Sequence, residues 1–250
     1  RRSTILVCFR HHHVAIDSLF GTLGIGILPS AFEFMDHLNF SAIEDQMGLK
    51  TPYPNPCFVI VELDGREEQV KEDLRRLTPL LDSLGKVLAL GYEDDVRWIW
   101  DLRRELSPSM YRLRPNKSSH DVVVPRSRLG DLLDAVEEIS KEIGLPIPVF
   151  GHLGDGNLHV NIMYDVEIDR EREMLVTGTK RLLSTVVGMG GSISGEHGIG
   201  ITKAPYLEME LGAISLSVMQ AIKRALDPNN ILNPHKIFYS QGLSLSSPKE

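Results

Sequence analysis

The sequence predicts an α+β fold built on a mostly antiparallel, ferredoxin-like (βαββαβ-type) sheet with helices largely on one face. The first observation behind this prediction is the stretch 150–161, where apolar runs flank an Asp-Gly dipeptide, a pattern typical of an antiparallel β-hairpin. The second is the order strand–helix–strand–strand–helix–strand across residues 122–196, which is the ferredoxin-like order. Residues 4–91 can be interpreted as a looser copy of the same pattern.

The predicted strands are short apolar runs bounded by turn-forming residues. They cover Thr4–Phe9, Ile27–Glu33, Phe58–Leu63, Val87–Gly91, Val122–Val124, Pro148–His152, Leu158–Tyr164 and Ser192–Glu196. Helices are predicted where apolar residues recur at helical spacing. The clearest are Glu67–Leu84, Glu93–Leu106, Arg128–Ile143, Glu171–Val187 and Ile214–Leu226. Gly144 stands where a left-handed residue ends the third of these helices.

Composition excludes several classes of protein. The chain of 250 residues is 42% hydrophobic and 24% charged, as in an ordinary globular protein. Its net charge of −7 argues against nucleic acid or an anionic membrane as a partner. The 2 cysteines rule out a disulfide framework and suit a reducing, cytoplasmic compartment. No strand–GxGxxG–helix unit or Walker loop is found, since the glycines in 21–26 have the wrong spacing.

The predicted hairpin offers a pair of histidines. If Asp155 and Gly156 are the two central residues of the turn, His152 pairs with His159 across the strands. Residues directly opposite on an antiparallel pair share a face, with Cβ atoms roughly 5 Å apart. Two imidazoles so placed can hold one metal ion, and Asn161 lies on the same face.

A second segment, 190–200, runs Gly-Gly-Ser-Ile-Ser-Gly-Glu-His-Gly-Ile-Gly. Glu196 could complete a set of two histidines and one carboxylate, which suits zinc or another divalent first-row metal. His197 would point away from Glu196 in a regular strand, but a glycine-flanked bend can bring both to one cavity. An imidazole beside such a metal is a natural general base. The alternative is that these histidines are ordinary polar residues lining a loop.

Three motifs carry a family resemblance. They are Gly-His-Leu-Gly-Asp-Gly-Asn-Leu-His-Val-Asn (151–161), Gly-Glu-His-Gly-Ile-Gly (195–200) and Leu-Asp-Pro-Asn-Asn-Ile-Leu-Asn-Pro-His-Lys (226–236). In this order they resemble the C-terminal half of FAD-linked 2-hydroxy-acid dehydrogenases of the vanillyl-alcohol-oxidase type. That group includes D-lactate dehydrogenase, the glycolate oxidase D subunit and D-2-hydroxyglutarate dehydrogenase.

The resemblance implies roles for individual residues. It makes His152, His159 and Glu196 metal ligands, with zinc the usual metal. It makes His197 the catalytic base. The residues implied to bind substrate are Asn161, Arg103 for the carboxylate, Ser107 as a helper hydroxyl, and Lys117. A planar guanidinium suits bidentate carboxylate binding, although Arg104 beside Arg103 leaves the choice between them open. His120 stands where the family usually has an acidic residue.

The resemblance also divides the chain. Residues 1–200 correspond to a substrate-binding cap, 201–240 to a helical segment that returns to the flavin domain, and 241–250 to a tail. Asn233 and Lys236 lie where that segment approaches FAD, although a helix stop at 227–228 followed by turn residues also explains the pattern. FAD would be held mainly by a domain outside this chain, so we expect the chain alone to be inactive.

The resulting interpretation is the catalytic half of an enzyme that oxidises a D-2-hydroxy acid to the 2-oxo acid. The implied partners are a flavin domain or subunit and an electron acceptor such as a quinone or an Fe-S or flavoprotein carrier, reached at the membrane surface if the acceptor lies there. A homo-oligomer is compatible with the sequence. The alternatives are a standalone metal-dependent hydrolase and a non-catalytic cap subunit that pairs with a separate flavoprotein.

Overall fold

The computed structural model describes residues 1–47 and 50–238, which form a seven-stranded antiparallel sheet with helices on both faces. Its strands are β1 (Arg2–Phe9), β2 (Ala31–Met35), β3 (Cys57–Asp64), β4 (Lys86–Tyr92), β5 (Asn116–Val123), β6 (Val149–His152) and β7 (Asn157–Tyr164). The longer helices are α1 (His12–Gly24), α2 (His37–Met47), α3 (Glu67–Leu84), α4 (Arg97–Ser109), α5 (Leu129–Ile143), α6 (Asp169–Gly188) and α8 (Ala213–Leu226).

The sheet consists of two halves that meet at one seam. The strand order is β4-β1-β3-β2-β6-β7-β5, so β1 to β4 form the complete ferredoxin-like arrangement and β5 to β7 form a second, incomplete one. The first half is therefore the more regular of the two, rather than the looser copy. At the seam, β2 pairs with β6 through Glu33↔His152, Phe34↔Gly151 and Met35↔Phe150.

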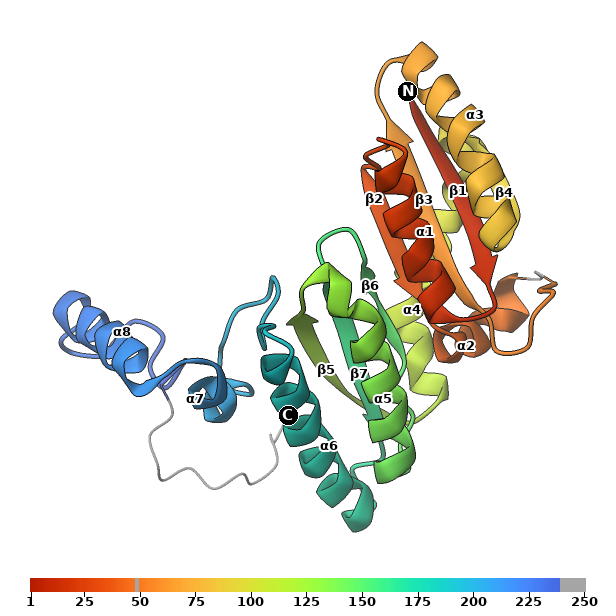
Figure 1. The fold of residues 1–250 in the computed structure, drawn as a ribbon. Coiled ribbons are helices and arrows are strands. Elements are labelled where there is room, and N and C mark those ends of the chain that lie inside the picture. The colour runs from red at the N-terminus through yellow and green to blue at the C-terminus, as the bar shows by residue number, and fades with distance from the viewer. Residues whose placement is uncertain (48–49, 239–250) are drawn as a thin grey trace.

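Helices cover the two faces of the sheet unequally (Figure 1). α1, α3, α5 and α6 lie over one face and enclose the larger apolar core, which contains Leu19, Leu77, Val136 and Leu182. α2 and α4 cover the other face over a smaller core. The predicted fold class, with helices largely on one face, is confirmed.

Three strand predictions need correction. Ser192–Glu196 is not a strand, because only Ser192 bridges to Val123 before the chain bends away. β2 begins at Ala31 instead of Ile27, since the preceding residues leave α1 through a loop. β5 begins at Asn116, because its polar first half pairs with β7 although it lacks an apolar pattern.

The helices differ from prediction mainly in the first half. α1 and α2 were not among the predicted helices. In α1, burial of much of the surface and the histidines at its N-cap and first two positions hide the apolar periodicity of a helix. The helix predicted to begin at Glu93 starts with a 3-10 turn at Glu93–Val96, followed by α4.

The C-terminal part departs from the sheet. After a short helix α7 (Leu207–Glu210), α8 stands apart from the rest of the molecule and has no buried residue (Figure 1). Among the described residues, no helix combines the length and apolar character that a bilayer span requires. The predicted tail, 241–250, lies outside the described residues.

Candidate functional site

The β6–β7 hairpin brings His152 and His159 together, but through a different register from the predicted one. The turn covers residues 153–156, so His152 pairs with Asn157, and His159 pairs with Phe150. The register moves because Leu153 is buried in the core and donates its backbone N–H to Phe32 of β2, which starts the turn earlier. A shift by two residues keeps both histidines on one face, and their ring centroids lie 5.4 Å apart.

A carboxylate lies near the Nδ1 atom of each imidazole, and that of Glu33 is close enough to hydrogen-bond to His152. His152 Nδ1 lies 2.5 Å from Glu33 Oε1, and His159 Nδ1 lies 3.9 Å from Asp121 Oδ1. The two Nε2 atoms face a third carboxylate, since Glu196 Oε1 is 3.9 Å from that of His152 and 3.7 Å from that of His159. Metal-binding histidines commonly have this arrangement, with one nitrogen held by an acceptor and the other free for the ion.

Asp121 of β5 fixes the loop that carries Glu196. Its Oδ2 accepts the backbone N–H groups of Glu196 and His197, both at 2.8 Å, and its Oδ1 accepts from Asn157 Nδ2 at 2.6 Å. Gly195 permits this approach, because a Cβ there would lie 1.8 Å from Asn157 Nδ2. The bend that follows explains why residues 192–196 do not continue as a strand.

His197 joins the group through that bend. Its ring stacks on His159 with centroids 5.6 Å apart, and its Nε2 lies 3.7 Å from Glu196 Oε1. The His197 and Glu196 side chains are exposed by 62% and 57%, whereas His159 is largely covered. The cluster therefore has a buried side on the sheet and an open side towards solvent.

Arg103 reaches the same cluster from α4. Its guanidinium donates to Glu33 Oε2 at 2.8 Å and lies over the Phe150 ring, 4.4 Å from the centroid. Arg104 points to solvent and pairs with Asp101 of its own helix. The structure thus places Arg103, and not Arg104, beside the histidines.

The other predicted substrate-binding residues lie along the same face. Lys117 Nζ donates to Ser107 Oγ at 2.6 Å, which joins β5 to the turn of α4 after Arg103. Asn161 is buried next to His159 on β7, and its Nδ2 donates to the backbone oxygens of His159 and Pro148. Burial lowers the pKa of the Lys117 ammonium.

The predicted flavin contacts lie elsewhere. Asn233 and Lys236 are exposed in the segment after α8. That segment returns towards the site at Ile237, whose N–H donates to the Gly200 carbonyl at 2.8 Å. The structure therefore brings it near the loop of Glu196 and His197, but not into the histidine cluster.

Opposite electrostatic effects act on the two hairpin histidines. The hydrogen bond to Glu33 raises the pKa of His152. Burial lowers the pKa of His159, and the nearby His152 lowers it further. Burial raises the pKa of Glu33, but hydrogen bonds from His152 and Arg103 outweigh it and hold that pKa below its ordinary value. The site thus has an ionised carboxylate at its base and a neutral imidazole beside it.

Comparison with known proteins places this arrangement in a family. Residues 1–237 match the family model described as FAD linked oxidases, C-terminal domain. The chain belongs to the FAD-linked oxidase C-terminal domain family. Glycolate oxidase subunit GlcD of Bacillus subtilis is 31% identical over 95% of this chain and 51% of its own length. The mitochondrial D-lactate dehydrogenase [cytochrome] of Arabidopsis thaliana is 30% identical over 95% of this chain and 42% of its own.

This FAD-linked oxidase domain spans about half the length of the curated relatives it matches. Among solved structures, p-cresol methylhydroxylase with bound substrate aligns with a TM-score of 0.72 at 15% identity, over 95% of this chain and 52% of the other. That likeness supports the fold of the domain.

Two residues of the site were not predicted from the sequence. Glu33 and Asp121 are both buried, yet each contacts a histidine of the cluster. For Glu33, a charged residue inside an apolar strand run was the available signal, because an unpaired carboxylate is rarely buried. Asp121 follows polar residues and offered no such signal. In this structure, Glu33 hydrogen-bonds to His152, and Asp121 holds the loop of Glu196 and His197.

Proposed function

We propose that this domain is the substrate-binding and catalytic half of a flavin-dependent dehydrogenase that oxidises a D-2-hydroxy acid to the 2-oxo acid. The observation that carries the proposal is the convergence of His152, His159 and Glu196 beside His197 and Arg103. Groups that can hold a cation, accept a proton and bind a carboxylate thus occupy one face of the sheet. The names of the relatives, which include glycolate oxidase and D-lactate dehydrogenase, support a 2-hydroxy acid as substrate and FAD as cofactor.

The donor set fits a divalent metal. One ligand atom each from His152, His159 and Glu196 lie within 4.8 Å of one another. Two imidazoles and one carboxylate suit zinc and related first-row ions, and three protein ligands leave a coordination position open. We infer that these residues hold such an ion, with Glu33 as the outer acceptor that fixes the His152 ring and Asp121 as the acceptor that holds the backbone of Glu196.

The residues around these three candidate ligands have separate roles in binding the substrate and accepting its proton. Arg103, oriented by Glu33 and Phe150, binds the substrate carboxylate through the guanidinium edge that Glu33 leaves free. Ser107, Lys117 and Asn161 line the same face and orient the remainder of the molecule. His197 accepts the hydroxyl proton at Nε2, the nitrogen next to Glu196.

A bound flavin supplies an acceptor for two electrons and the α-hydrogen, and a bound divalent metal supplies positive charge beside the hydroxyl oxygen. The carrier that would take up the electrons is a quinone or an Fe-S or flavoprotein. Membership in a FAD-linked family favours this oxidation over the metal-dependent hydrolysis that the same ligand set could also serve.

The activity test uses this chain together with its flavin-binding domain. Reduction of a dye acceptor by glycolate, D-lactate and D-2-hydroxyglutarate gives kcat/KM for each acid. Replacing Arg103 by Ala removes about 2–3 kcal/mol of charged hydrogen bonding, so kcat/KM should fall roughly 30–150-fold. Arg104→Ala is the matched control and should change little. Equal effects of the two substitutions would contradict the role of Arg103.

The metal test needs only the isolated chain. Zinc bound after desalting is counted for the unaltered protein and for His159→Ala and Glu196→Gln. Each variant should hold one zinc fewer per chain. Undiminished stoichiometric binding by His159→Ala would overturn the ligand assignment.

We also propose that residues 201–240 pack on the flavin-binding domain, with residues 1–200 forming the cap. The support is the apolar stripe of α8, where side chains spaced four apart are all exposed: Ile214, Val218, Ile222 and Leu226. Asn233 and Lys236 follow this stripe and would approach the flavin. Co-purification with the flavin-binding domain should be lost in Ile214→Glu/Ile222→Glu, whereas Ser217→Glu, on the same helix, should retain it. Retention by the double variant would contradict the proposal.

A further inference from the structure

A second cluster of metal-ligating side chains lies on the opposite face of the sheet. His11, His12 and His13 form the start of α1, and each offers a ring nitrogen within 4.8 Å of one from each of the others. The ring centroids of His11 and His12 are 4.1 Å apart, and those of His12 and His13 are 4.7 Å apart. Three consecutive imidazoles thus gather around one small volume.

Two carboxylates from α5 complete the cluster. Asp134 places one oxygen 2.8 Å from His12 Nε2 and the other 2.9 Å from His13 Nε2. Glu137, one turn further along α5, lies 3.5 Å from His12 Nδ1 through Oε1. Gly130 gives the rings room against α5, because a Cβ there would lie 2.6 Å from the His13 ring.

The hydrogen-bond chemistry leaves ring nitrogens of this cluster without protons. An ionised carboxylate only accepts, so Asp134 requires that Nε2 of both His12 and His13 be the donors. In a neutral ring the lone pair then sits on Nδ1. The lone pair of His12 Nδ1 consequently faces the Glu137 carboxylate, and two electron-rich atoms in that position attract a cation. His11 Nδ1 accepts the His13 backbone N–H at 3.3 Å, which places the proton of the neutral His11 ring on Nε2. Metal binding at Nε2 would move that proton to Nδ1 and break this long hydrogen bond.

The His12 ring is shielded from solvent, since its side chain is only 8% exposed. An ion held there would therefore lie between α1 and α5 and not on the outer surface.

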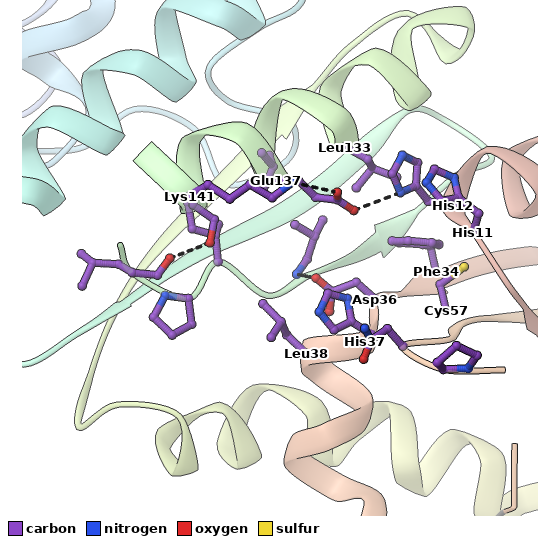
Figure 2. Close-up of a pocket in the computed structure, with 18 of the residues that line it drawn as sticks. His11, His12, Phe34, Asp36, His37, Leu38, Cys57, Leu133, Glu137 and Lys141 are labelled. Carbon is purple, nitrogen blue, oxygen red and sulfur yellow. Dashed lines mark hydrogen bonds and ion pairs between the residues drawn. The ribbon is translucent and has the colours of Figure 1, made fainter. Parts of the chain in front are cut away.

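We propose that the three histidines and Glu137 form a second binding site, for one divalent first-row transition-metal ion such as zinc. Imidazole nitrogens and a carboxylate oxygen are the ligands that such ions prefer. Asp134 acts from outside as the acceptor that fixes two of the rings. An ion can reach the site through a cavity of about 630 Å³, which is lined in part by His11, His12 and Glu137 (Figure 2).

The position of the cluster gives the ion a structural role. α1 belongs to the first half of the sheet and α5 to the second, and within the sheet these halves are joined by the short pairing of β2 with β6. An ion bound by His12 of α1 and Glu137 of α5 links the halves on the face opposite the hydroxy-acid site. Metal binding should therefore raise the thermal stability of the chain.

The test uses the untagged chain carrying His159→Ala, so that the His152 site does not contribute. After chelator treatment, zinc alone is titrated in competition with a chromophoric chelator. One zinc should bind per chain and raise the melting temperature. Adding His13→Ala/Glu137→Gln should abolish stoichiometric binding, and adding Asp134→Asn should weaken it roughly 10–100-fold. His13 and Glu137 are both about half exposed, so these variants should fold.

The matched control adds His235→Ala, which removes an exposed histidine of the C-terminal segment and should leave zinc affinity unchanged. Absence of stoichiometric zinc binding in His159→Ala, or equal binding after His13→Ala/Glu137→Gln, would overturn the proposal. Because both outcomes are read in the His159→Ala background, they are independent of whether the His152 site holds an ion.

Discussion

Replacing Asp121 by Asn tests whether one buried carboxylate organises the candidate active site. Asp121 is 1% exposed and accepts three hydrogen bonds, two from the backbone of Glu196 and His197 and one from Asn157. Asparagine has nearly the same shape but provides one acceptor oxygen instead of two. If that oxygen keeps the backbone N–H groups, its amide faces the Asn157 amide donor-to-donor.

The number of hydrogen bonds lost sets the expected loss of stability. One hydrogen bond to a charged acceptor is lost, and hydrogen bonds to charged groups contribute about 1.5–3 kcal/mol. Rotation of the Asn157 amide cannot restore it freely, because Asn157 Nδ2 also donates to the Val122 carbonyl at 3.1 Å. We therefore expect the free energy of unfolding to fall by about 2 kcal/mol. Because the two remaining loop contacts lose their charge, zinc affinity at His152, His159 and Glu196 should also fall, by roughly 10–100-fold.

Urea unfolding followed by circular dichroism measures the first effect, and competition with a chromophoric chelator measures the second. The control is Asp95→Asn, which removes the same charge from an exposed position. A variant as stable as the control, with unchanged zinc affinity, would refute the view that Asp121 holds the Glu196 loop.

Three further outcomes are expected. Glu33→Gln leaves Arg103 without its charged partner, so the free energy of unfolding should fall by about 3 kcal/mol or more in urea denaturation; NMR titration should also show a lower His152 pKa, and an unchanged one would count against the contact. Gly195→Ala meets Asn157, so stability should fall by about 1–3 kcal/mol in the same assay, whereas Gly188→Ala, with open space at its Cβ, should not show this loss. Burial lowers the pKa of His120 to about 4; its folded pKa is thus below the unfolded value of about 6.5, and up to about 3 kcal/mol of stability should be lost as pH falls from 6.5 to 4. A His120→Gln variant should lack that part of the pH dependence.

The sequence predicted most of the strands and longer helices because their apolar periods are clear. Thr4–Phe9 and Phe58–Leu63 are mostly apolar runs, and each forms a central strand within two residues of the predicted ends. Apolar periodicity did not predict α1, because that helix is buried on more than one side. It also did not predict the first half of β5, because strand pairing there does not depend on apolar residues. In both cases tertiary contacts override local pattern.

For the candidate site, residue type was predictable but arrangement was not. The candidate ligands at 152, 159 and 196 were predicted from side-chain chemistry and a hairpin, and the structure brings these three side chains close together. The register was wrong because nothing local shows that Leu153 would be buried against β2. Glu33 and Asp121 were missed for a related reason, since their role depends on long-range pairing of β2 with β6 and of β5 with β7.

The narrow seam between β2 and β6 has a mechanical consequence. Arg103 is held by Glu33 on one side of it, and His197 is held by Asp121 on the other. A slight twist of one half against the other would therefore change the spacing between these two side chains. A small molecule bound by both side chains would restrict the motion of the two halves. Its binding would then slow amide hydrogen exchange along β2 and β6.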